Sequence, residues 1–500
     1  MEIPIDDELK RIAKGEILSD TWSREIYSVD ASNYVIKPSV VVCPVDKCDV
    51  EKICKYCFSK NMPITGRGAG TGLLGQSLSS NVVMDFTKYM NKIIEIGDDY
   101  IEVQPGLVKG ILDRELKKRG KFLPPDPASS NYCTIGGMIA NNSSGAHCLS
   151  YGSTIDFLQE ICIVYSDGTT GIISGNNKSE DPKMKNLLRL LSPLIHIIQS
   201  RYPKVNKNSC GYRLDAVIND KGFSPQKIFA ASEGTLGILA SAKLKILDIP
   251  LHRHLMLLGF KNLLSAINTV PLILQYSPVA LEMLDHTIIS LGERDNPQQL
   301  NKNSGCILFV EFAGDRIEDI DRKTHLCKDG LSGKCNIIES ASDESTITKI
   351  WEARKGALNR IMKLTYGTRK PIGLIEDTVV NPSLLHAYTQ YLLQTYIDNK
   401  LEYVVYGHVG DGNLHTRPLI DIDSKSEIDL IERIAQQIFN RVIRIGGTIT
   451  GEHGDGLGRS KYIPSMYGNE IYSIFLQVKK IFDPTFLMNP GKKILLNSRV

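Results

Sequence analysis

The sequence predicts an α+β protein with more than one domain, and three observations support this fold class. The chain has 500 residues, more than one hydrophobic core usually holds. Short β-branched runs alternate with amphipathic helical patterns in the first third. From about residue 250 to 440 glycine becomes rarer and the helical patterns lengthen, which is typical of a separate domain. We therefore expect a helical segment over residues 1–35, domains over 36–248 and 249–440, and a C-terminal segment over 441–500.

The first elements follow from hydrophobic spacing. Residues 40–43 form a β-branched run, and either Asp46 or Asp49 can cap the helix that follows. One face of that helix carries Val50, Ile53, Cys54, Cys57 and Phe58. Further strands are expected at residues 62–65, 82–85 and 306–312. The eleven cysteines are scattered, which suits reduced thiols, and we interpret Cys54 and Cys57 as buried hydrophobic residues rather than metal or iron–sulfur ligands.

Composition and charge exclude several classes of protein. The formal net charge is only +3, and no run of Lys and Arg is interleaved with aromatic residues, so nucleic acid is not an expected partner. The start, MEIPIDDELKRIAKG, lacks the basic and apolar regions of a signal peptide, and no apolar run reaches spanning length. A cytoplasmic location is expected, with peripheral membrane contact left open. The oligomeric state is also open, and a homodimer is one alternative.

Three clusters of small residues, at 65–77, 124–153 and 231–238, predict a binding site for a large cofactor. The first contains G-x-G-x-x-G at Gly70, Gly72 and Gly75, but a strand begins almost at once, which leaves no room for the crossover helix of a dinucleotide-binding fold. A Walker A loop is excluded because no Gly-Lys-Ser/Thr follows. Glycine-rich backbone can still wrap closely round an anion. Converging clusters of this kind suggest a ligand with a pyrophosphate and an aromatic ring system.

The stretch EYVVYGHVGDGNLHTRP, residues 402–418, predicts a β-hairpin. Asp411 and Gly412 suit a two-residue type I′ turn, which would place His408 directly opposite His415 on one face. Two imidazoles so placed could chelate a divalent metal, and a third ligand would complete an open site. The alternative is a histidine pair packed in the core, and the hairpin alone leaves both interpretations open.

Six motifs occur in the order found in FAD-linked 2-hydroxyacid dehydrogenases of the vanillyl-alcohol oxidase type. They are PITGRGAGTGLLGQ, PDPASSNYCTIGGMIANNSSG, ASEGTLGI, YGHVGDGNLH, GEHGDGLGR and NPGK. The chain resembles D-lactate dehydrogenase and the FAD subunit of glycolate oxidase over nearly its whole length. This resemblance implies a two-part FAD-binding domain, a substrate or cap domain, and a C-terminal segment that returns to the flavin. The motifs are much less specific for the substrate than for the fold.

The resemblance also implies which residues bind FAD. The first loop would hold the pyrophosphate with Arg67, Gly68, Gly70, Thr71 and Gly72. The second cluster would line the flavin with Pro125, Asp126, Ser130, Thr134, Gly137, Asn141, Ser144 and Gly145. Glu233, Gly237 and Ile238 would lie near the adenosine, and Asn489 near the isoalloxazine. Because the first loop has no histidine, we expect non-covalent FAD, although His147 in the second cluster keeps a covalent link open.

In metal-dependent relatives the hairpin histidines and a later glutamate hold a divalent ion. The resemblance implies zinc or manganese here, held by His408, His415 and Glu452. His453 would then be the general base that takes the proton of a 2-hydroxy acid, whose hydride passes to FAD. The resemblance favours this metal site over the core pair.

Two arginines are the predicted substrate ligands: Arg354, which matches a substrate-facing arginine of the family, and Arg417, which shares the face of His415. Ile375 stands where 2-hydroxyglutarate-type enzymes have a lysine, so a dicarboxylate is disfavoured and a small D-2-hydroxy acid such as D-lactate, then glycolate, is preferred. We interpret Glu376 and Asp377 as strand-end charges rather than groups that support the site.

No cysteine follows Cys335, so no iron–sulfur module is expected within this sequence. Electrons would leave FAD for an external acceptor, namely a quinone, a cytochrome, an electron-transfer flavoprotein or a separate iron–sulfur subunit. Two alternatives are an oxidase that uses O₂ and a flavin subunit that only relays electrons.

Overall fold

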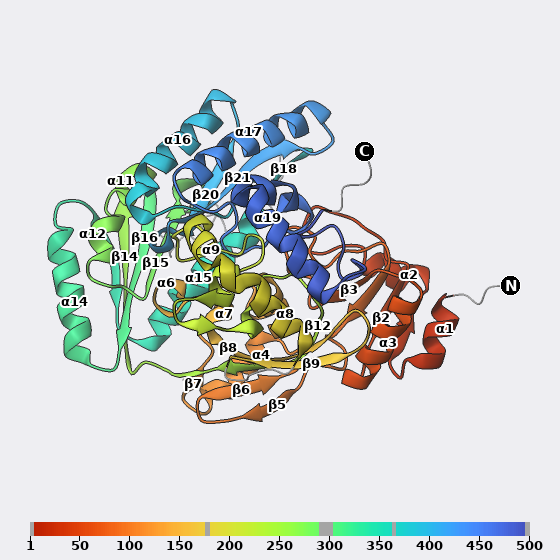
Figure 1. The fold of residues 1–500 in the computed structure, drawn as a ribbon. Coiled ribbons are helices and arrows are strands. Elements are labelled where there is room, and N and C mark those ends of the chain that lie inside the picture. The colour runs from red at the N-terminus through yellow and green to blue at the C-terminus, as the bar shows by residue number, and fades with distance from the viewer. Residues whose placement is uncertain (1–4, 176–180, 290–303, 363–366, 496–500) are drawn as a thin grey trace.

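The computed structural model describes residues 5–175, 181–289, 304–362 and 367–495 (Figure 1). Three sheets organise it. The first has the strand order β1-β2-β4-β3, with β1 at Glu16–Leu18, β2 at Val40–Cys43, β3 at Ile64–Arg67 and β4 at Val82–Asp85. The strands β2, β4 and β3 are parallel, and β1 adds antiparallel to β2. Residues 1–35 were predicted to be helical. They also contain the strand β1, which completes this sheet.

Helix α3, Lys47–Ser59, connects β2 to β3 and covers one face of the first sheet. Asp46 caps it by accepting the backbone N–H of Asp49. Cys54 and Cys57 are fully buried against the sheet, which confirms their interpretation as core residues. All eleven cysteines are free.

The second sheet is five-stranded and antiparallel, in the order β5-β6-β12-β8-β9. Its strands are β5 Ile93–Ile96, β6 Tyr100–Val103, β8 Leu158–Val164, β9 Thr170–Ser174 and β12 Ile238–Lys245. Side chains of β12 alternate between buried and partly exposed, as a strand with one face on a core requires. Short pairs are β7 Lys121–Phe122 with β13 Leu247–Asp248, and β10 Ile218–Asn219 with β11 Gly222–Phe223.

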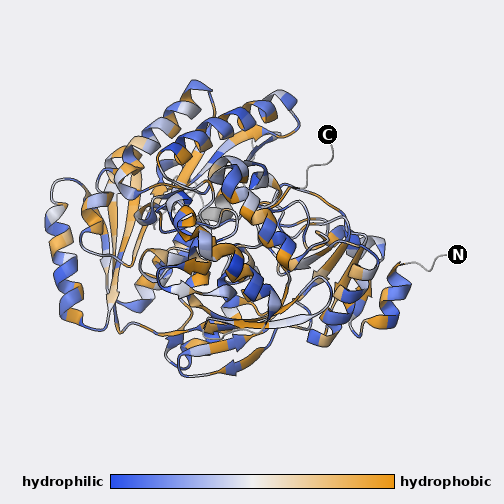
Figure 2. Cartoon of the chain, in the orientation of Figure 1, coloured by the Kyte–Doolittle hydropathy of each residue, from blue (hydrophilic) through white to orange (hydrophobic). Residues whose placement is uncertain are grey.

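The third sheet has eight strands, in the order β17-β14-β16-β15-β20-β21-β18 with β19 beside β21. The strands are β14 His252–Phe260, β15 Ala280–Asp285, β16 Cys306–Gly314, β17 Asn336–Ala341, β18 Arg369–Pro371, β19 Thr378–Val379, β20 Tyr403–His408 and β21 Asn413–Asp421. Alternate residues of β14 pack into two different hydrophobic clusters, so both faces of the sheet are covered. Figure 2 shows these strands in orange between helices with blue outer sides.

Long helices flank the third sheet: α14 Ile317–Gly330, α15 Glu344–Met362, α16 Leu385–Asp398 and α17 Lys425–Arg444. Other helices are α1 Ile5–Ile12, α2 Thr21–Ile26, α4 Lys109–Lys117, α5 Ile135–Asn141, α6 Cys148–Tyr151, α7 Thr154–Phe157, α8 Pro182–Leu191, α9 Ile195–Arg201, α10 Leu214–Val217, α11 Leu263–Ile267, α12 Val270–Leu274 and α18 Gly456–Arg459. None of the helices in the described ranges combines the length and the apolar character that a membrane crossing requires.

The C-terminal part returns to the first sheet. Helix α19, Ile463–Phe482, leads into a segment in which Met488 forms an isolated bridge with Ile64 of β3. The backbone N–H of Asn489 donates to the carbonyl of Ile64 over 2.9 Å. Figure 1 shows this dark blue end of the chain beside the red first sheet. Residues far apart in sequence thus meet at the edge of β3, next to the first glycine loop.

Candidate active site

The two histidines predicted to bind metal lie on a hairpin whose register differs from the prediction. In the pairing of β20 with β21, His408 is opposite Asn413 rather than His415. The two-residue type I′ turn is wrong, because Val409–Asp411 form a 3-10 turn and Gly412 alone is left-handed, with φ 72°. The shift is two residues, so His408 and His415 still share a face, and their ring centroids are 5.1 Å apart.

Glu452 lies between three imidazoles. Its Oε1 is 2.8 Å from His408 Nε2, 3.2 Å from His415 Nε2 and 3.7 Å from His453 Nε2. The rings of His415 and His453 stack with their centroids 4.7 Å apart. The three predicted metal ligands each offer an atom within 4.8 Å of the others, so the structure brings them together.

The second oxygen of Glu452 is held from the other side. Ser144 Oγ donates to Oε2 over 2.6 Å, and Lys207 Nζ donates to it over 3.0 Å. Lys207 is fully buried, lies 3.9 Å from Asp411 and also donates to the carbonyl of Gly145 over 3.1 Å. Glu452 therefore presents one oxygen to the histidines while the other is fixed.

His408 is oriented by a carboxylate that sequence reasoning missed. Its Nδ1 is 2.6 Å from Oε1 of Glu282 on β15, and Arg354 Nη2 donates to the other oxygen of Glu282 over 2.6 Å. A carboxylate on one ring nitrogen leaves the other nitrogen for a metal. The sequence did contain a signal for this residue: Glu282 is an acidic residue in the middle of the otherwise apolar run ALEML.

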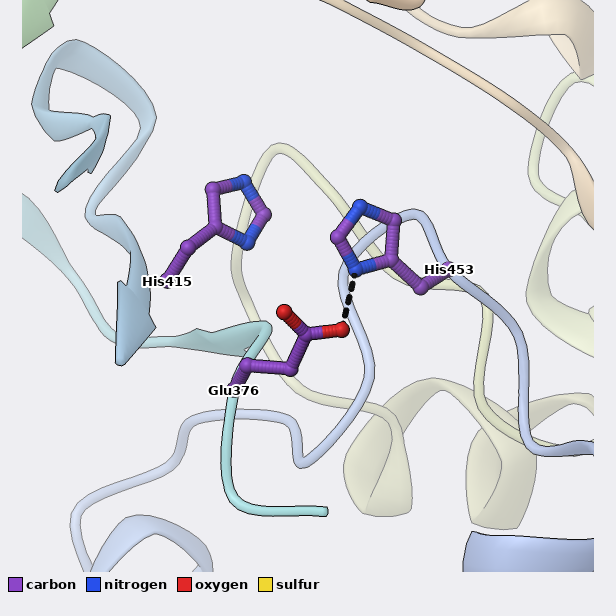
Figure 3. Close-up of side chains that lie close together, drawn as sticks. All are labelled: Glu376, His415 and His453. Carbon is purple, nitrogen blue, oxygen red and sulfur yellow. Dashed lines mark hydrogen bonds and ion pairs between the residues drawn. The ribbon is translucent and has the colours of Figure 1, made fainter. Parts of the chain in front are cut away.

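Glu376 and Asp377 are not strand-end charges, and that interpretation is wrong. Both are fully buried. Glu376 Oε1 lies 3.0 Å from His453 Nδ1, and Figure 3 shows its carboxylate turned towards that ring. Asp377 accepts backbone N–H groups of Gly451, Glu452 and His453. The two neighbouring acids thus hold the segment that carries the predicted ligand and the predicted base.

Charges at the site are unevenly distributed over the imidazoles. Burial opposes the charged form of His408, but the carboxylates on either side outweigh burial and raise its pKa to about 9. Burial lowers the pKa of His415 to about 4, which leaves a neutral ring. Burial also opposes a charge on His453, yet Glu376 outweighs it and raises the pKa of that imidazole. A divalent cation would take the place of a proton here, because metal ligands must be deprotonated.

One cavity joins the three clusters of small residues to the histidines. Of the predicted FAD residues, those that line it are Arg67, Gly68, Gly70, Thr71, Gly72, Thr134, Gly137, Asn141, Ser144, Glu233, Gly237 and Ile238. Arg354, His408, His415, Glu452 and His453 line its other part, together with Tyr406. Cofactor loops and predicted catalytic groups therefore face the same space.

Five predicted FAD residues lie outside the lining of this cavity, namely Pro125, Asp126, Ser130, Gly145 and Asn489. Asp126 instead pairs with His147, at 2.8 Å from its Nδ1, and His147 does not line the cavity either. Asn489 Nδ2 donates to the carbonyls of Gln76 and Glu233 over 2.9 and 2.6 Å. Asn489 thereby links the first glycine loop to the third cluster.

The two predicted substrate arginines lie in different places. Arg354 lines the cavity, is buried, and has an Nε without a hydrogen-bond partner among the described residues. Arg417 is 2% exposed, is not among the lining residues, and places Nη2 2.6 Å from Glu376 Oε2. Only Arg354 is therefore positioned beside the cavity.

Comparisons with known proteins account for both large parts of the chain. The model of the FAD binding domain matches residues 38–174, and that of FAD linked oxidases, C-terminal domain, matches residues 249–493. The chain belongs to the FAD-linked oxidase family. The clusters at 65–77 and 124–153 fall in the first of these matches and the histidine segments in the second, while the cluster at 231–238 lies between the two.

Individual relatives of this FAD-linked oxidase are similar in sequence. D-2-hydroxyglutarate dehydrogenase of Haemophilus influenzae is 30% identical over 98% of this chain and 51% of its own length. The glycolate oxidase subunit GlcD of Bacillus subtilis is 29% identical over 99% of this chain and 97% of its own. D-lactate dehydrogenase of Anaerostipes hadrus is 25% identical, over 97% and 94%. The chain spans about half the length of the D-2-hydroxyglutarate dehydrogenases that it matches.

Solved structures confirm the fold class. A p-cresol methylhydroxylase superposes on this chain with a TM-score of 0.70 at 15% sequence identity. The superposition covers 97% of this chain and 95% of the p-cresol methylhydroxylase chain. The predictions of an FAD-linked 2-hydroxyacid dehydrogenase family and of a vanillyl-alcohol oxidase type fold are confirmed.

The residues present fit FAD. A Cβ on Gly68 would lie 2.1 Å from Thr134 Oγ1, so the first loop and the second cluster approach so closely that only glycine fits. The first loop has no helix between residues 68 and 81, as predicted, and its backbone N–H groups remain available to a pyrophosphate. Apolar side chains of Phe86, Met138 and Phe229 also line the cavity and suit aromatic rings.

The residues also fit a divalent cation. Two imidazoles and a carboxylate are an N₂O donor set that zinc and manganese accept. His415 Nδ1 is buried and has no hydrogen-bond partner in the described part of the chain.

Arg459 is a further buried residue that sequence reasoning missed. It has no exposed surface, pairs with Asp377 at 3.2 Å and donates to the carbonyls of Gly373, Leu374 and Glu376. Its position in GEHGDGLGR did mark it as part of a motif. The role was hidden because its partners lie more than 80 residues away in the chain.

Proposed function

We propose that this chain is an FAD-dependent dehydrogenase that oxidises a small D-2-hydroxy acid, with D-lactate favoured, to the 2-oxo acid. The observation that carries the proposal is the single cavity in which the cofactor clusters meet Arg354 and the histidines. A 2-hydroxy acid presents a carboxylate beside a hydroxyl, and these groups match an arginine and a base placed in one space.

The roles of the chain's own residues follow from their contacts. Arg354 would bind the carboxylate, since its Nε has a free donor and Glu282 fixes its Nη2. His453 would remove the hydroxyl proton at Nε2, because Glu376 engages its Nδ1. His408 and His415 are buried, so water has little access to them, and their polar contacts are stronger than they would be in water. When bound, FAD would accept the hydride equivalent and a divalent ion would acidify the hydroxyl.

We further propose that His408, His415 and Glu452 hold that divalent ion, zinc or manganese. Their donor atoms converge, and Glu282, Ser144 and Lys207 orient two of them from behind. Partners of this kind are common around functional metal ligands. Electrons would then leave FAD for an external acceptor.

D-2-hydroxyglutarate is a second candidate substrate, favoured by the similarity to four D-2-hydroxyglutarate dehydrogenases. It would need a cation for its distal carboxylate. Ile375 is apolar and fully buried, and Arg417 is already paired with Glu376. These two positions favour the smaller acid.

An anaerobic substrate screen on the purified yellow protein tests the proposal. Flavin absorbance should bleach within seconds with D-lactate, more slowly with glycolate, and least with D-2-hydroxyglutarate, while L-lactate serves as the stereochemical control. In air, turnover with an artificial acceptor should form no hydrogen peroxide; peroxide at the rate of turnover would identify an oxidase. If no 2-hydroxy acid bleaches the flavin, a relay role without substrate oxidation replaces this proposal.

The predicted base has its own test. His453→Ala should retain FAD and fold but lose about 100- to 10,000-fold in the rate of flavin reduction, the range that a positioned base contributes. Unchanged reduction would remove His453 from the mechanism.

A further inference from the structure

Arg417 carries a buried charge and is not among the residues that line the cavity. Its side chain lies on β21, two residues beyond His415, and only 2% of it is exposed. Its Nη2 is 2.6 Å from Glu376 Oε2, and Glu376 itself has no exposed surface. A buried arginine paired with a buried carboxylate favours the ionised form of both. Burial alone would raise the pKa of Glu376, but the charge of Arg417, ahead of its other partners, holds that pKa well below its usual range.

The two oxygens of Glu376 have different partners. Oε2 faces Arg417, and Oε1 faces His453 Nδ1 at 3.0 Å. The backbone is fixed as well, because Arg459 Nη2 donates to the carbonyl of Glu376 over 2.5 Å. The carboxylate therefore has little freedom to turn away from the imidazole of His453, and Figure 3 shows one carboxylate oxygen joined to that ring by a dashed line.

This arrangement determines which nitrogen of His453 is exposed to the reaction. An ionised carboxylate accepts hydrogen bonds only, so His453 must donate from Nδ1, and the lone pair of the neutral ring is then on Nε2. That nitrogen is on the side of Glu452, 3.7 Å from its Oε1. The orientation of the base is thus set from behind.

We propose that Glu376 is a positioning residue for His453, and that Arg417 acts on the reaction through Glu376 rather than by binding the substrate. The proposal rests on the proposed function, in which His453 is the base. In this proposal Arg417 holds Glu376, and Glu376 orients the ring of His453. Arg354 is then the arginine that contacts the acid.

Another interpretation is a second metal site, because Glu376, His415 and His453 also offer atoms within 4.8 Å of one another. The guanidinium of Arg417 argues against it. A positive group already sits 2.6 Å from one oxygen of Glu376, and a divalent ion on the same carboxylate would be repelled by it. We therefore expect one ion per chain.

Variants at the pair distinguish positioning from substrate binding. Glu376→Leu and Glu376→Leu/Arg417→Leu should each reduce flavin roughly 100-fold more slowly at saturating substrate, because a disordered base loses most of its contribution. The double variant keeps the test valid if an unpaired Arg417 prevents the single variant from folding. Glu376→Gln, which keeps an acceptor oxygen, should recover part of the rate. Arg369→Met, which removes an arginine ion-paired to Glu427 at 2.6 Å beside the same strand, is the matched control.

Binding of oxalate, read as a change in the visible spectrum of oxidised flavin, gives a readout independent of turnover. Its dissociation constant, and the substrate concentration for half-maximal reduction, should change less than about threefold in the double variant and in Arg417→Met, since only Arg354 contacts the acid. A loss of oxalate affinity of tenfold or more in Arg417→Met with an unchanged maximal rate would overturn the proposal and restore Arg417 as a substrate ligand.

The tautomer and the metal content can be measured without substrate. In protein labelled with ¹⁵N-histidine, His453, assigned by its loss in His453→Ala, should show a protonated Nδ1. A neutral His453 with its proton on Nε2 and none on Nδ1, or two ions per chain, would overturn the inference. If wild type oxidises no 2-hydroxy acid, the proposed function fails while these two measurements still decide how Glu376 and His453 are arranged.

Discussion

Lys207 Nζ donates to Glu452 Oε2 over 3.0 Å, although 245 residues separate them in the chain. The lysine comes from the segment before α10 and the glutamate from the GEHGDG segment after α17. With Ser144, Lys207 thereby joins the FAD-binding half of the chain to the predicted metal ligand. The partners of Glu452 therefore come from both halves.

Lys207→Met should destabilise the metal-free protein by about 3–5 kcal/mol, because Asp411 loses its buried ammonium partner and Glu452 keeps only His408 as a cationic partner. Zn²⁺ should then raise the thermal midpoint of the variant more than that of wild type, since the ion supplies the missing charge. Lys479→Met removes an equally buried pair with Asp483 at 2.6 Å and is the control. Equal responses to Zn²⁺ in wild type and Lys207→Met would contradict this prediction.

Removal of the metal should abolish most activity but leave the flavin in place. In the proposed site His408, His415 and Glu452 would bind the ion, whereas the glycine-rich clusters would hold FAD. We expect dialysis against a chelator to slow flavin reduction roughly 100-fold and Zn²⁺ or Mn²⁺ to restore it, in line with the contribution of a Lewis acid. Metal analysis should find one ion per chain beforehand. Indifference to chelation would favour the histidine pair as a core contact.

Gly68→Ala should lose FAD while the protein stays folded. The new Cβ would lie 2.1 Å from Thr134 Oγ1, so the first loop must move away from the second cluster. The ratio of flavin to protein absorbance after purification should fall to about a tenth or less, a loss of roughly 1.4 kcal/mol or more in binding. Gly120→Ala introduces strain at φ +68° in open space and is the control for backbone effects alone. A fully yellow Gly68→Ala protein would show that the loop is not the cofactor cradle.

The pH dependence of stability should reveal His147. Burial disfavours its charge, but Asp126 and Glu311 outweigh burial and raise the pKa of His147 to about 10 in the folded chain. Its value in the unfolded chain is about 6.5. The ion pairs of protonated His147 thus stabilise the folded chain fully below about pH 6.5. This stabilisation declines as the pH rises from about 6.5 to about 10.

His147→Gln measures this contribution. The difference in stability between wild type and variant should be largest near pH 6 and shrink towards pH 10, by on the order of 1.4 kcal/mol for each pH unit. Thermal midpoints across this range are the measurement, and His325→Gln, at an exposed position, is the control. A difference that stays constant with pH would show that His147 is not held protonated.

Much of the first half of the fold could be predicted from local pattern. The strand at Val40–Cys43, its capped helix and the strand at Val82–Asp85 all form where hydrophobic spacing indicated. Such elements are visible in sequence because each buries one contiguous apolar face. The strand β1 was missed, since three partly buried residues at the edge of a sheet leave almost no periodic signal.

The register of the hairpin could not be predicted from local sequence pattern. Asp-Gly between apolar runs indicated a turn correctly, and alternation put both histidines on one face. The register differs by two residues, because Val409–Asp411 form a 3-10 turn and the carbonyl of Gly412 accepts a hydrogen bond from the backbone N–H of Val380, outside the hairpin. A Cβ on Gly412 would lie 1.8 Å from the carbonyl of Val380, a segment that packs against this turn.

The sequence by itself determined the family, the cofactor clusters and the histidines that meet at one cavity, because ordered motifs and short-range spacing carry that information. The tertiary structure alone decided that Arg417 pairs with Glu376, that Glu282 orients His408, and that Lys207 fixes Glu452. Each of these contacts joins residues dozens to hundreds of positions apart. These contacts are strong because both partners are buried. Which residues are buried depends on how separate sheets and loops pack rather than on any local pattern.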